Sequence, residues 1–354
     1  MKERELKIRE AYRGDSSRKK VLVTGHTGFK GAWLLGMLQE LDCDVIGFSL
    51  DPKPQDLYHQ VPHFHPKVDI RADLKDRDQL RSILHEFQPD VIFHLAAQSL
   101  IYEGIKDPAT TYETNILGLV YLLEALRNLS HSGVVVVTSD KCYEPSDEVH
   151  TETSRLGGNE PYSVSKAAIE MIVHAYRQDH SFDHSIATAR SGNVIGSGDL
   201  AEHRLIPDWV RSQKEQQVFS LRKPTAYRPF QHVLEPLMGY LILGQHLQNR
   251  EMAEAWNFGP QKSLQVQDMI ALCEQYRHQN QSKVLSSNTT SFLEQNHLHI
   301  DSSKAKRTFA WQNKLTPEQM IAWTLEGYFC SKTSKIEDIC RRQIRDYWKM
   351  YFSE

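Results

Sequence analysis

Short apolar runs alternate with longer segments of helical periodicity through the first half of the chain. Each run is apolar throughout, as in a strand that is covered on both faces of a sheet. The segments between the runs carry apolar side chains three and four residues apart, as in helices that pack on one face. The pattern predicts strands at 19–25, 43–51, 65–76, 89–98, 133–143 and 185–196. It predicts helices at 31–42, 77–87, 111–129 and 160–180.

Strands that alternate with helices predict an α/β fold with a Rossmann-type doubly wound parallel sheet. Beyond Asn193 the alternation weakens, and loops rich in Arg, Pro and His separate the apolar segments. We expect residues 1–19 to lead into a Rossmann domain at 20–192. Residues 193–354 are expected to form mainly a smaller C-terminal α/β lobe that binds the substrate, with segments interleaved with the core. The amphipathic segment 336–354 is expected to dock on the protein's own core.

Composition and charge exclude several classes of protein. The 354 residues carry a formal charge of −3, which argues against a nucleic-acid-binding surface. No run approaches the ~18 consecutive apolar residues of a membrane span, and the charged N-terminus lacks the apolar core of a signal peptide. We therefore expect a cytoplasmic protein with no nucleic-acid or membrane partner. The cysteines form no CxxC pair and the His-x-His stretches lack a third ligand, so no metal site is expected.

The stretch "TGHTGFKG" places Gly25, Gly28 and Gly31 between the first predicted strand and the first helix. Glycine permits a tight turn there and lets the backbone approach a pyrophosphate at the helix N-terminus. A glycine triplet can also serve helix packing, but its place between a strand and a helix favours dinucleotide binding. The GxxGxxG spacing is typical of short-chain dehydrogenase/reductase enzymes.

Polar residues after the next two strands are candidates for the adenosine end of a dinucleotide. Asp51 could hold a ribose hydroxyl, which would favour NAD over NADP, and Ser49 could share that role. Asp73 and Leu74 follow the third strand and could flank the adenine. An ordinary turn explains these positions about as well.

Tyr162 and Lys166 stand four residues apart in "YSVSK", on one face of a predicted helix. A nearby ammonium group would lower the pKa of the phenol and make it a usable base near neutral pH. YxxxK also occurs by chance on surface helices, but here it follows the fifth strand of a chain that carries the glycine motif. We therefore predict a catalytic pair.

The fifth strand ends in an acid next to a lysine, Asp140 and Lys141 in "TSDKCY". The carboxyl ends of parallel strands are where ligands bind, so charged side chains there are candidates for acid–base chemistry. The structural alternative is an ion pair that merely ends a strand.

These motifs resemble those of the extended short-chain dehydrogenase/reductases that act on nucleotide sugars. The glycine motif, "HLAAQ" and "PYSVSK" carry the broad resemblance. Residues 20–328 are further similar to the CDP-glucose 4,6-dehydratases. The stretches that narrow the match are "GHTGFKGAW", "TSDKCYE", "GNVIGSGD", "RLIPD", "RPFQHVLEPLMGYL", "EAWNFGP" and "DSSKAKRTFAW".

The resemblance implies an NAD-dependent lyase that converts CDP-D-glucose into CDP-4-dehydro-6-deoxy-D-glucose. Oxidation at C4 makes the C5 proton acidic, water is then eliminated across C5 and C6, and the hydride returns to C6. Tyr162, assisted by Lys166, would be the base for the C4 hydroxyl, with Ser139 or Thr138 sharing the hydrogen bond.

The resemblance implies separate residues for the elimination. Asp140 would be the acid that protonates the leaving C6 hydroxyl. Lys141 stands where related dTDP-sugar dehydratases carry a glutamate, and it would serve in C5 proton transfer. A lysine in that place must be partly neutral to act as a base.

The resemblance also implies which residues bind ligands. The cofactor-binding positions are Gly25, Thr27, Gly28, Phe29, Gly31, Asp51, Asp73, Leu74, Leu95, Ala96, Ala97, Tyr162 and Lys166. The substrate-binding positions are Asn115, Asn193, Arg204, Leu205, Arg228 and Asn257. Of these, the arginines would clamp the diphosphate, because guanidinium groups match phosphate oxygens. Asn115 would help to order the active site.

Segment 99–105, "SLIYEGI", departs from the family pattern near the sugar. Tyr102 and Glu103 stand where basic residues are common, and Gly104 and Ile105 replace a Ser-Tyr step. The departure leaves two alternatives open: another nucleotide-sugar dehydratase or 4-epimerase, and an NAD- and nucleotide-sugar-binding protein of weakened activity. An epimerase has no need of a C5/C6 acid–base pair.

The resemblance extends to partners and pathway. A homodimer or a dimer of dimers is expected by analogy, with helices 111–128 and 160–179 paired across the interface. The expected role is deoxysugar synthesis for a bacterial surface polysaccharide such as the O-antigen of lipopolysaccharide.

Overall fold

The protein is organised around a parallel sheet of seven strands, in the spatial order β12-β7-β5-β4-β1-β2-β3. The computed structural model describes residues 3–14, 18–247, 252–277, 284–286, 296–330 and 335–353. The strands are β1 (Lys20–Thr24), β2 (Asp44–Ser49), β3 (Val68–Arg71), β4 (Val91–His94), β5 (Gly133–Val137), β7 (Ser185–Ser191) and β12 (Ala255–Phe258). The predicted doubly wound α/β fold is confirmed, and so is the parallel pairing of the strands.

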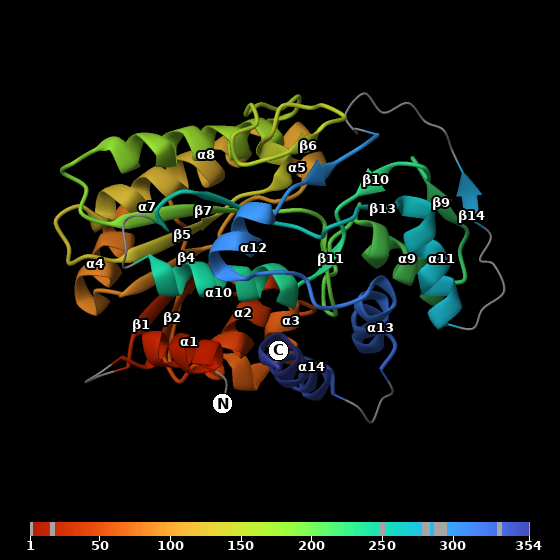
Figure 1. Cartoon of the computed structure of the whole chain (residues 1–354), viewed down its shortest axis with the longest axis horizontal. Helices are drawn as coiled ribbons and strands as arrows, with labels where there is room; N and C mark the ends of the chain where they lie inside the picture. Colours follow the sequence, from red (N-terminus) through yellow and green to blue (C-terminus); the bar gives the residue numbers. More distant parts are fainter. Residues whose placement is uncertain are drawn as a thin grey trace.

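Alternate side chains of each central strand enter different cores, because successive residues of a strand point to opposite faces. In β5, Val135 lies in the core formed with α2 (Phe29–Gln39) and α10 (Leu234–His246), whereas Val134 and Val136 lie in the opposite core. The opposite core is covered by α4 (Arg77–Phe87), α7 (Gly118–Leu126) and α8 (Pro161–Gln178). Figure 1 shows these helices on the two faces of the sheet.

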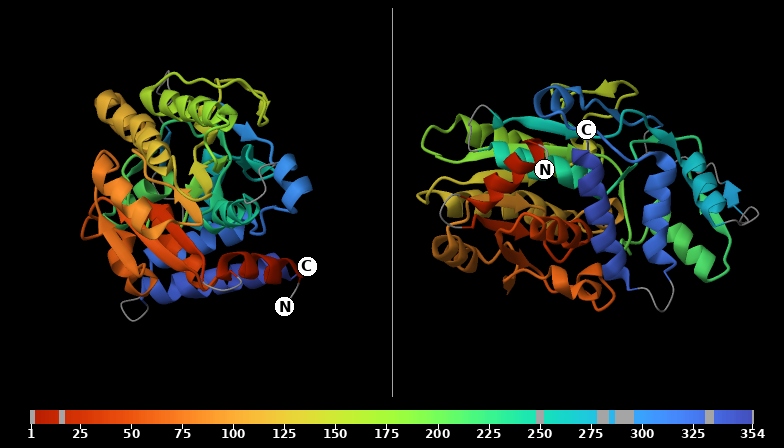
Figure 2. Two further views of the ribbon diagram at one scale, coloured as in Figure 1. Left: turned by 90° about the vertical axis from the view of Figure 1, so that its left-hand side faces the viewer. Right: turned by 60° about the horizontal axis from the view of Figure 1, so that its bottom comes forward.

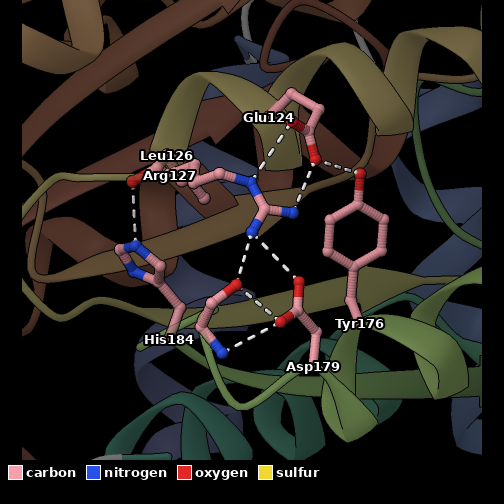
Figure 3. Close-up of polar contacts among 7 residues, drawn as sticks. Glu124, Leu126, Arg127, Tyr176, Asp179 and His184 are labelled. Carbon is pink, nitrogen blue, oxygen red and sulfur yellow. Dashed lines mark hydrogen bonds and ion pairs between the residues drawn. The ribbon is translucent and has the colours of Figure 1, made fainter.

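The predicted long helix 111–129 is built from three consecutive pieces. These are α6 (Pro108–Tyr112), a π-helical segment (Glu113–Leu117) and α7. The predicted helix at 160–180 is α8. Arg127 ties the far ends of α7 and α8 together through Glu124, Asp179 and Ser181 (Figure 3). Tyr176 adds a 2.7 Å hydrogen bond from α8 to Glu124, so the two helices are held at the end remote from the sheet's carboxyl edge.

The C-terminal lobe has its own apolar core and lies beside the carboxyl edge of the sheet (Figure 1). Trp209, Met269 and Leu325 are central to that core. Its helices are α9 (Leu205–Lys214), α11 (Val266–Tyr276) and α13 (Pro317–Tyr328), and α12 (Ser303–Phe309) packs on β12. Its short strands are β8 (Val194–Ile195), β9 (Phe219–Leu221), β10 (Tyr227–Arg228), β11 (Gln231–His232), β13 (Leu264–Gln265), β14 (Val284–Ser286) and β15 (His299–Ile300). The prediction of six sheet strands omitted β12, which returns from this part of the chain to pair with β7.

The terminal segments are helical and pack on each other. Residues Glu3–Arg13 form α1 and residues Ile336–Phe352 form α14. The Trp348 indole donates to Glu5 over 3.0 Å, and the Arg9 guanidinium lies 5.1 Å from the centroid of the Trp348 ring. Figure 2 shows the two ends of the chain close together. The expected docking of the C-terminal segment on the protein's own core is observed, since α14 also packs against α2.

The carboxyl group of Glu235, in α10, is buried and links this helix to α14 and to the segment before α13 by hydrogen bonds. It is 1% exposed and accepts hydrogen bonds from the Tyr347 hydroxyl (2.6 Å) and the Leu315 amide (2.8 Å). Burial raises its pKa from 4.5 to about 7, and these hydrogen bonds only partly oppose the rise. The folded protein therefore holds this proton more tightly than the unfolded chain does.

Replacing Glu235 by glutamine is expected to reduce the loss of stability at higher pH. The contribution of a carboxyl with a raised pKa is complete below its ordinary pKa and is lost as the pH rises through the folded value. Relative to the native chain, Glu235→Gln should gain about 2–3 kcal/mol in free energy of unfolding between about pH 5 and about pH 8. Urea unfolding at both pH values measures the gain. An equal difference between the two proteins at both values would contradict the prediction.

Candidate active site

A cavity of about 580 Å³ lies at the carboxyl edge of the sheet, between the Rossmann domain and the C-terminal lobe. Its wall brings together the glycine loop, the ends of β2, β4, β5 and β7, and residues of α8 and α9. This is the edge at which ligands bind in doubly wound folds. Most of the site residues predicted from the sequence line this one cavity.

The backbone of the glycine loop packs so closely on its neighbours that side chains at Gly25 and Gly31 would not fit. Gly25 has a φ of +71°, and a Cβ atom there would lie 2.7 Å from the Ala96 amide nitrogen. A Cβ atom at Gly31 would lie 2.2 Å from the carbonyl oxygen of Gly25. Gly28 caps α2 without a side-chain hydrogen bond, and it and the first residues of the helix line the cavity, where a helix N-terminus favours an anion. The loop therefore fits the pyrophosphate of a dinucleotide.

The predicted cofactor positions line the cavity with a single exception. Those on the wall are Gly25, Thr27, Gly28, Phe29, Gly31, Asp73, Leu74, Leu95, Ala96, Ala97, Tyr162 and Lys166. The exception is Asp51, whose side chain is 86% exposed and whose carboxylate lies 3.9 Å from the Arg71 Nε atom. The strand ends at Ser49, two residues earlier, and the lining of the cavity includes Ser49 and Leu50 but not Asp51. The alternative, Ser49, does line the wall, where its hydroxyl lies 2.7 Å from that of Thr27.

Residues 138–143, named here the catalytic turn, follow β5 directly. Ser139 caps a short 3₁₀ helix by accepting from the Lys141 amide (3.2 Å) and donates its hydroxyl to Asp140 Oδ1 (3.0 Å). Asp140 is 3% exposed, and its Oδ2 atom is buried without a hydrogen-bond partner. Burial raises the Asp140 pKa, an effect that Lys141 and Ser139 only partly offset. A carboxyl with a raised pKa is suited to donate a proton, and Lys141 lines the same cavity.

Tyr162 and Lys166 enter the cavity from the first turns of α8. Glu160 caps this helix by accepting from the amides of Tyr162 (2.7 Å) and Ser163 (2.9 Å), and Pro161 occupies its first position. The Lys166 ammonium donates to the Val137 carbonyl over 3.2 Å and lies 5.9 Å from the centroid of the Tyr162 ring. The helix thus fixes both side chains on one face, beside the catalytic turn.

The expected lowering of the Tyr162 pKa is wrong for the chain by itself. Burial raises the pKa of Tyr162 to about 12, and a hydrogen bond with Ser139 opposes the rise. The cost of burying a phenolate exceeds the effect of the nearby charges. Burial also lowers the pKa of Lys166 to about 8. Of the two hydroxyls proposed to assist Tyr162, that of Thr138 donates to Glu170 (2.5 Å) and that of Ser139 donates to Asp140 (3.0 Å).

The predicted substrate-binding residues fall into two groups. Asn193, Arg204, Leu205 and Arg228 line the cavity. Arg204 is oriented by an ion pair with Asp199 (2.8 Å) and donates to the Ser99 hydroxyl (3.3 Å). Both arginines face a cavity large enough for a nucleotide and can present guanidinium groups to phosphate oxygens.

Asn115 and Asn257 do not line the cavity. Asn115, in the π-helical segment, accepts from the Gln98 amide (2.8 Å) and donates to the Ser165 hydroxyl (2.9 Å). It therefore orders the loop after β4 and the start of α8 rather than contacting a ligand. Asn257, in β12, is completely buried and accepts from the Tyr143 hydroxyl (2.6 Å). Its substrate-binding assignment is not supported, because its amide is committed to the protein's own groups.

Lys30 is a cavity residue that the sequence reasoning missed. Its ammonium donates to the Ser191 hydroxyl (3.0 Å) and lies 3.4 Å from the Tyr240 hydroxyl. Burial lowers its pKa to about 7, and the charges of Arg204 and Lys166 add to the effect. The signal in the sequence was a lysine between Phe29 and a glycine at the start of an otherwise apolar helix.

Segment 99–105, which departs from the family pattern, forms part of the cavity wall and the helix α5 (Ile101–Lys106). The Tyr102 ring lies 4.3 Å from that of His203 and 5.1 Å from the Arg222 guanidinium, measured between ring centroids and to Cζ respectively. The segment therefore contacts the C-terminal lobe at the cavity mouth. Among the residues that the structure describes, no group of His, Cys, Asp and Glu side chains could hold a metal ion. Within the same ranges no helix has the length and apolar character needed to cross a bilayer.

Known proteins similar to this chain place it in a family. A CDP-glucose 4,6-dehydratase of Salmonella typhimurium is 34% identical over 93% of this chain and 96% of its own length. A dTDP-glucose 4,6-dehydratase of Xanthomonas campestris is 27% identical over 75% of this chain and 79% of its own. The crystal structure of a dTDP-glucose 4,6-dehydratase from Streptomyces venezuelae, with NAD bound, has a TM-score of 0.77 at 21% identity, covering 93% and 99% of the two chains.

The fold is shared with epimerases as well. UDP-glucose-4-epimerase from Stenotrophomonas maltophila has a TM-score of 0.79 at 19% identity, covering 88% of this chain and 98% of its own. Residues 21–259 match the model of the NAD dependent epimerase/dehydratase family, and they include the glycine loop, the catalytic turn and the Tyr-Lys pair. The chain is a member of the NAD dependent epimerase/dehydratase family.

Proposed function

We propose that the protein is an NAD-dependent nucleotide-sugar 4,6-dehydratase whose substrate is CDP-D-glucose and whose product is CDP-4-dehydro-6-deoxy-D-glucose. The observation that carries the proposal is the meeting of Asp140 and Lys141 with Tyr162 and Lys166 in one cavity. Tyr162 and Lys166 would serve the oxidation at C4. Loss of water requires a further acid and base, and Asp140 and Lys141 could supply them. We choose CDP as the nucleotide because the relative that is 34% identical over nearly the whole chain is a CDP-glucose 4,6-dehydratase.

The first step is the removal of the C4 hydroxyl proton by Tyr162. The loop of Gly25, Gly28 and Gly31 would hold NAD, which would supply the hydride acceptor for C4 and the hydride donor for C6. With a pKa near 12, the phenol needs help to give up its own proton, and its interaction with Ser139 acts to lower that pKa. The Lys166 ammonium, held by the Val137 carbonyl, adds a positive charge on the side of the helix that faces the cavity.

The second step is the loss of water across C5 and C6. Lys141 takes the C5 proton, which the C4 ketone has made acidic, and the electron pair moves into a C5–C6 double bond. The C6–O bond breaks as Asp140 donates its proton to the departing hydroxyl, which leaves as water. The buried and unpartnered Oδ2 atom of Asp140 suits that donation, because burial favours the protonated carboxyl.

A substrate panel tests the proposal. The purified protein is incubated with CDP-, dTDP-, GDP- and UDP-hexoses and NAD, and a product lighter by one water is sought by mass spectrometry. We expect CDP-glucose to give the 4-keto-6-deoxy product. If another sugar nucleotide reacts while CDP-glucose does not, the CDP preference fails. A C4 epimer without loss of water would make the protein an epimerase, and no reaction with any sugar would favour a binding protein.

We also propose a homodimer formed through α8 and the helix that ends in α7. Val164 and Met171, two helical turns apart on α8, are 38% and 65% exposed, and Leu117, in the π-helical segment that contacts α8, is 42% exposed. Exposed apolar side chains gathered on one face are typical of association surfaces. The further proposals are a cytoplasmic location and a role in deoxysugar synthesis for a bacterial surface polysaccharide such as O-antigen.

Replacing Met171 by glutamate is expected to convert the dimer to a monomer. A charge placed opposite its symmetry mate repels it and is buried without a partner, and both effects oppose association. Light scattering coupled to size-exclusion chromatography measures the molar mass. Val218→Glu, at a site that is 50% exposed in the C-terminal lobe, is the matched control and should remain dimeric. A Met171→Glu protein with unchanged molar mass would place the interface elsewhere.

A further inference from the structure

A buried ion pair lies directly beneath the catalytic turn. Arg190 of β7 donates to Glu170 Oε2 of α8 over 2.7 Å, and the two side chains are only 4% and 2% exposed. Burying two charges is costly unless hydrogen bonds satisfy their remaining polar atoms. Burial alone would raise the pKa of Glu170, but Arg190 and the hydrogen bonds of the carboxylate hold it below its ordinary value. The pair is therefore charged. Its other hydrogen bonds show which parts of the protein it contacts.

The ion pair contacts the catalytic turn at both of its ends. Glu170 Oε1 accepts the hydroxyl of Thr138, the first residue of the turn (2.5 Å). Arg190 donates to the hydroxyl of Tyr143, the last residue of the turn (2.9 Å), and its guanidinium lies 5.0 Å from the centroid of that ring. Asp140 lies between these two fixed points.

Glu170 also acts on Lys166, which precedes it by one turn of α8. Residues four apart lie on one face of a helix, so the two side chains leave α8 on the same side. Burial lowers the pKa of Lys166, and the negative charge of Glu170 is the largest influence that opposes this effect. A neutral residue at position 170 would leave the ammonium without that support.

We propose that the Glu170–Arg190 pair is a positioning pair, which holds the catalytic turn from both ends and acts through Glu170 on Lys166, one turn away on α8. The pair touches neither ligand, since neither residue lines the cavity. The inference rests on the proposed function only where it assigns dehydration to the turn. The fixation of the turn stands on the contacts alone, and the effect on Lys166 stands on its place one turn before Glu170 on α8.

A direct titration tests the effect on Lys166. The protein is labelled with ¹³C-lysine, and the Cε signal of Lys166 is identified by its absence in Lys166→Met. In Glu170→Gln the midpoint of its titration should fall by about one pH unit or more. Thr188→Val is the matched control: it removes another hydrogen bond to Glu170 Oε2 (2.7 Å) without removing the charge, and should leave the midpoint unchanged.

The pH profile of turnover provides a second readout. In Glu170→Gln the alkaline limb of kcat should move to lower pH together with the Lys166 midpoint, with KM little changed. Because a lone Arg190 can destabilise the fold, Glu170→Gln/Arg190→Gln is measured as well, and its Lys166 midpoint should fall in the same direction. An unmoved midpoint overturns the effect on Lys166, and an unchanged kcat in Glu170→Gln overturns the fixation of the turn. If the native protein turns over no sugar nucleotide, the proposed function fails, and the titration alone decides for or against the positioning pair.

Discussion

Replacing Lys141 by alanine is expected to stop dehydration while leaving oxidation at C4 intact. The C5 proton would lose its acceptor, so turnover to the 4-keto-6-deoxy product should fall by about 10²–10⁴-fold, the usual contribution of a general base. The C4 hydride would still be transferred, because Tyr162 and Lys166 are unchanged. NADH should therefore accumulate on the enzyme in a single turnover, where its near-ultraviolet absorbance can be followed.

Isotope exchange at C5 makes this test specific. With the native protein, deuterium from heavy water should enter the product at C5, and Lys141→Ala should lose this exchange. Lys106→Ala is a suitable control, because Lys106 is 78% exposed at the end of α5. Unchanged turnover and exchange in Lys141→Ala would remove this lysine from the mechanism and revive the alternative of a structural ion pair.

Tyr162→Phe should block the reaction at its first step, the oxidation at C4, and so prevent every later step. Without the phenol the C4 hydroxyl keeps its proton, so neither NADH nor the dehydrated product should form, and turnover should fall by about 10²–10⁴-fold or more. The absence of NADH separates this variant from Lys141→Ala, in which NADH accumulates. Stopped-flow absorbance with saturating substrate measures both.

A matched tyrosine lies on the same helix. Tyr176→Phe removes only a hydroxyl that contacts Glu124, at the far end of α8 (Figure 3), and should retain turnover. Calorimetric binding of NAD to Tyr162→Phe should remain measurable, because the glycine loop is untouched. NADH formation at the native rate in Tyr162→Phe would assign the first proton transfer to another group.

The sheet could be predicted from sequence because its signals are local. Continuous apolar runs mark strands covered on both faces, and the glycine spacing marks the one turn that must approach a phosphate. The strand β12 was omitted because its segment, "EAWNFGP", is short and lies among loops. Only its pairing with β7 makes it a strand, and that pairing depends on parts of the chain that are distant in sequence.

The site was predictable where a residue's direction follows from its element. Tyr162 and Lys166 share a helix face, and Asp140 follows a strand that ends at the ligand-binding edge. Asp51 and Asn257 could not be placed in this way. The direction of the Asp51 side chain depends on the path of the chain after β2. Asn257 accepts a hydrogen bond from Tyr143, a residue distant in sequence. The sign of the Tyr162 pKa change was equally out of reach, because it depends on the completeness of burial rather than on the spacing to Lys166.

The return of the chain to form β12 has a consequence for how this protein can change in evolution or by engineering. The segment that builds α9 and β9 is inserted between two strands that pair with each other, β7 and β12. Because α9 precedes β12 whereas α11 and α13 follow it, exchanging the substrate lobe with that of a relative would require junctions on both sides of β12 that preserve an edge of the sheet. A graft made at a single junction after β7 would replace β12 as well. New substrate preferences are thus more accessible through substitutions in the cavity wall than through the shuffling of lobes.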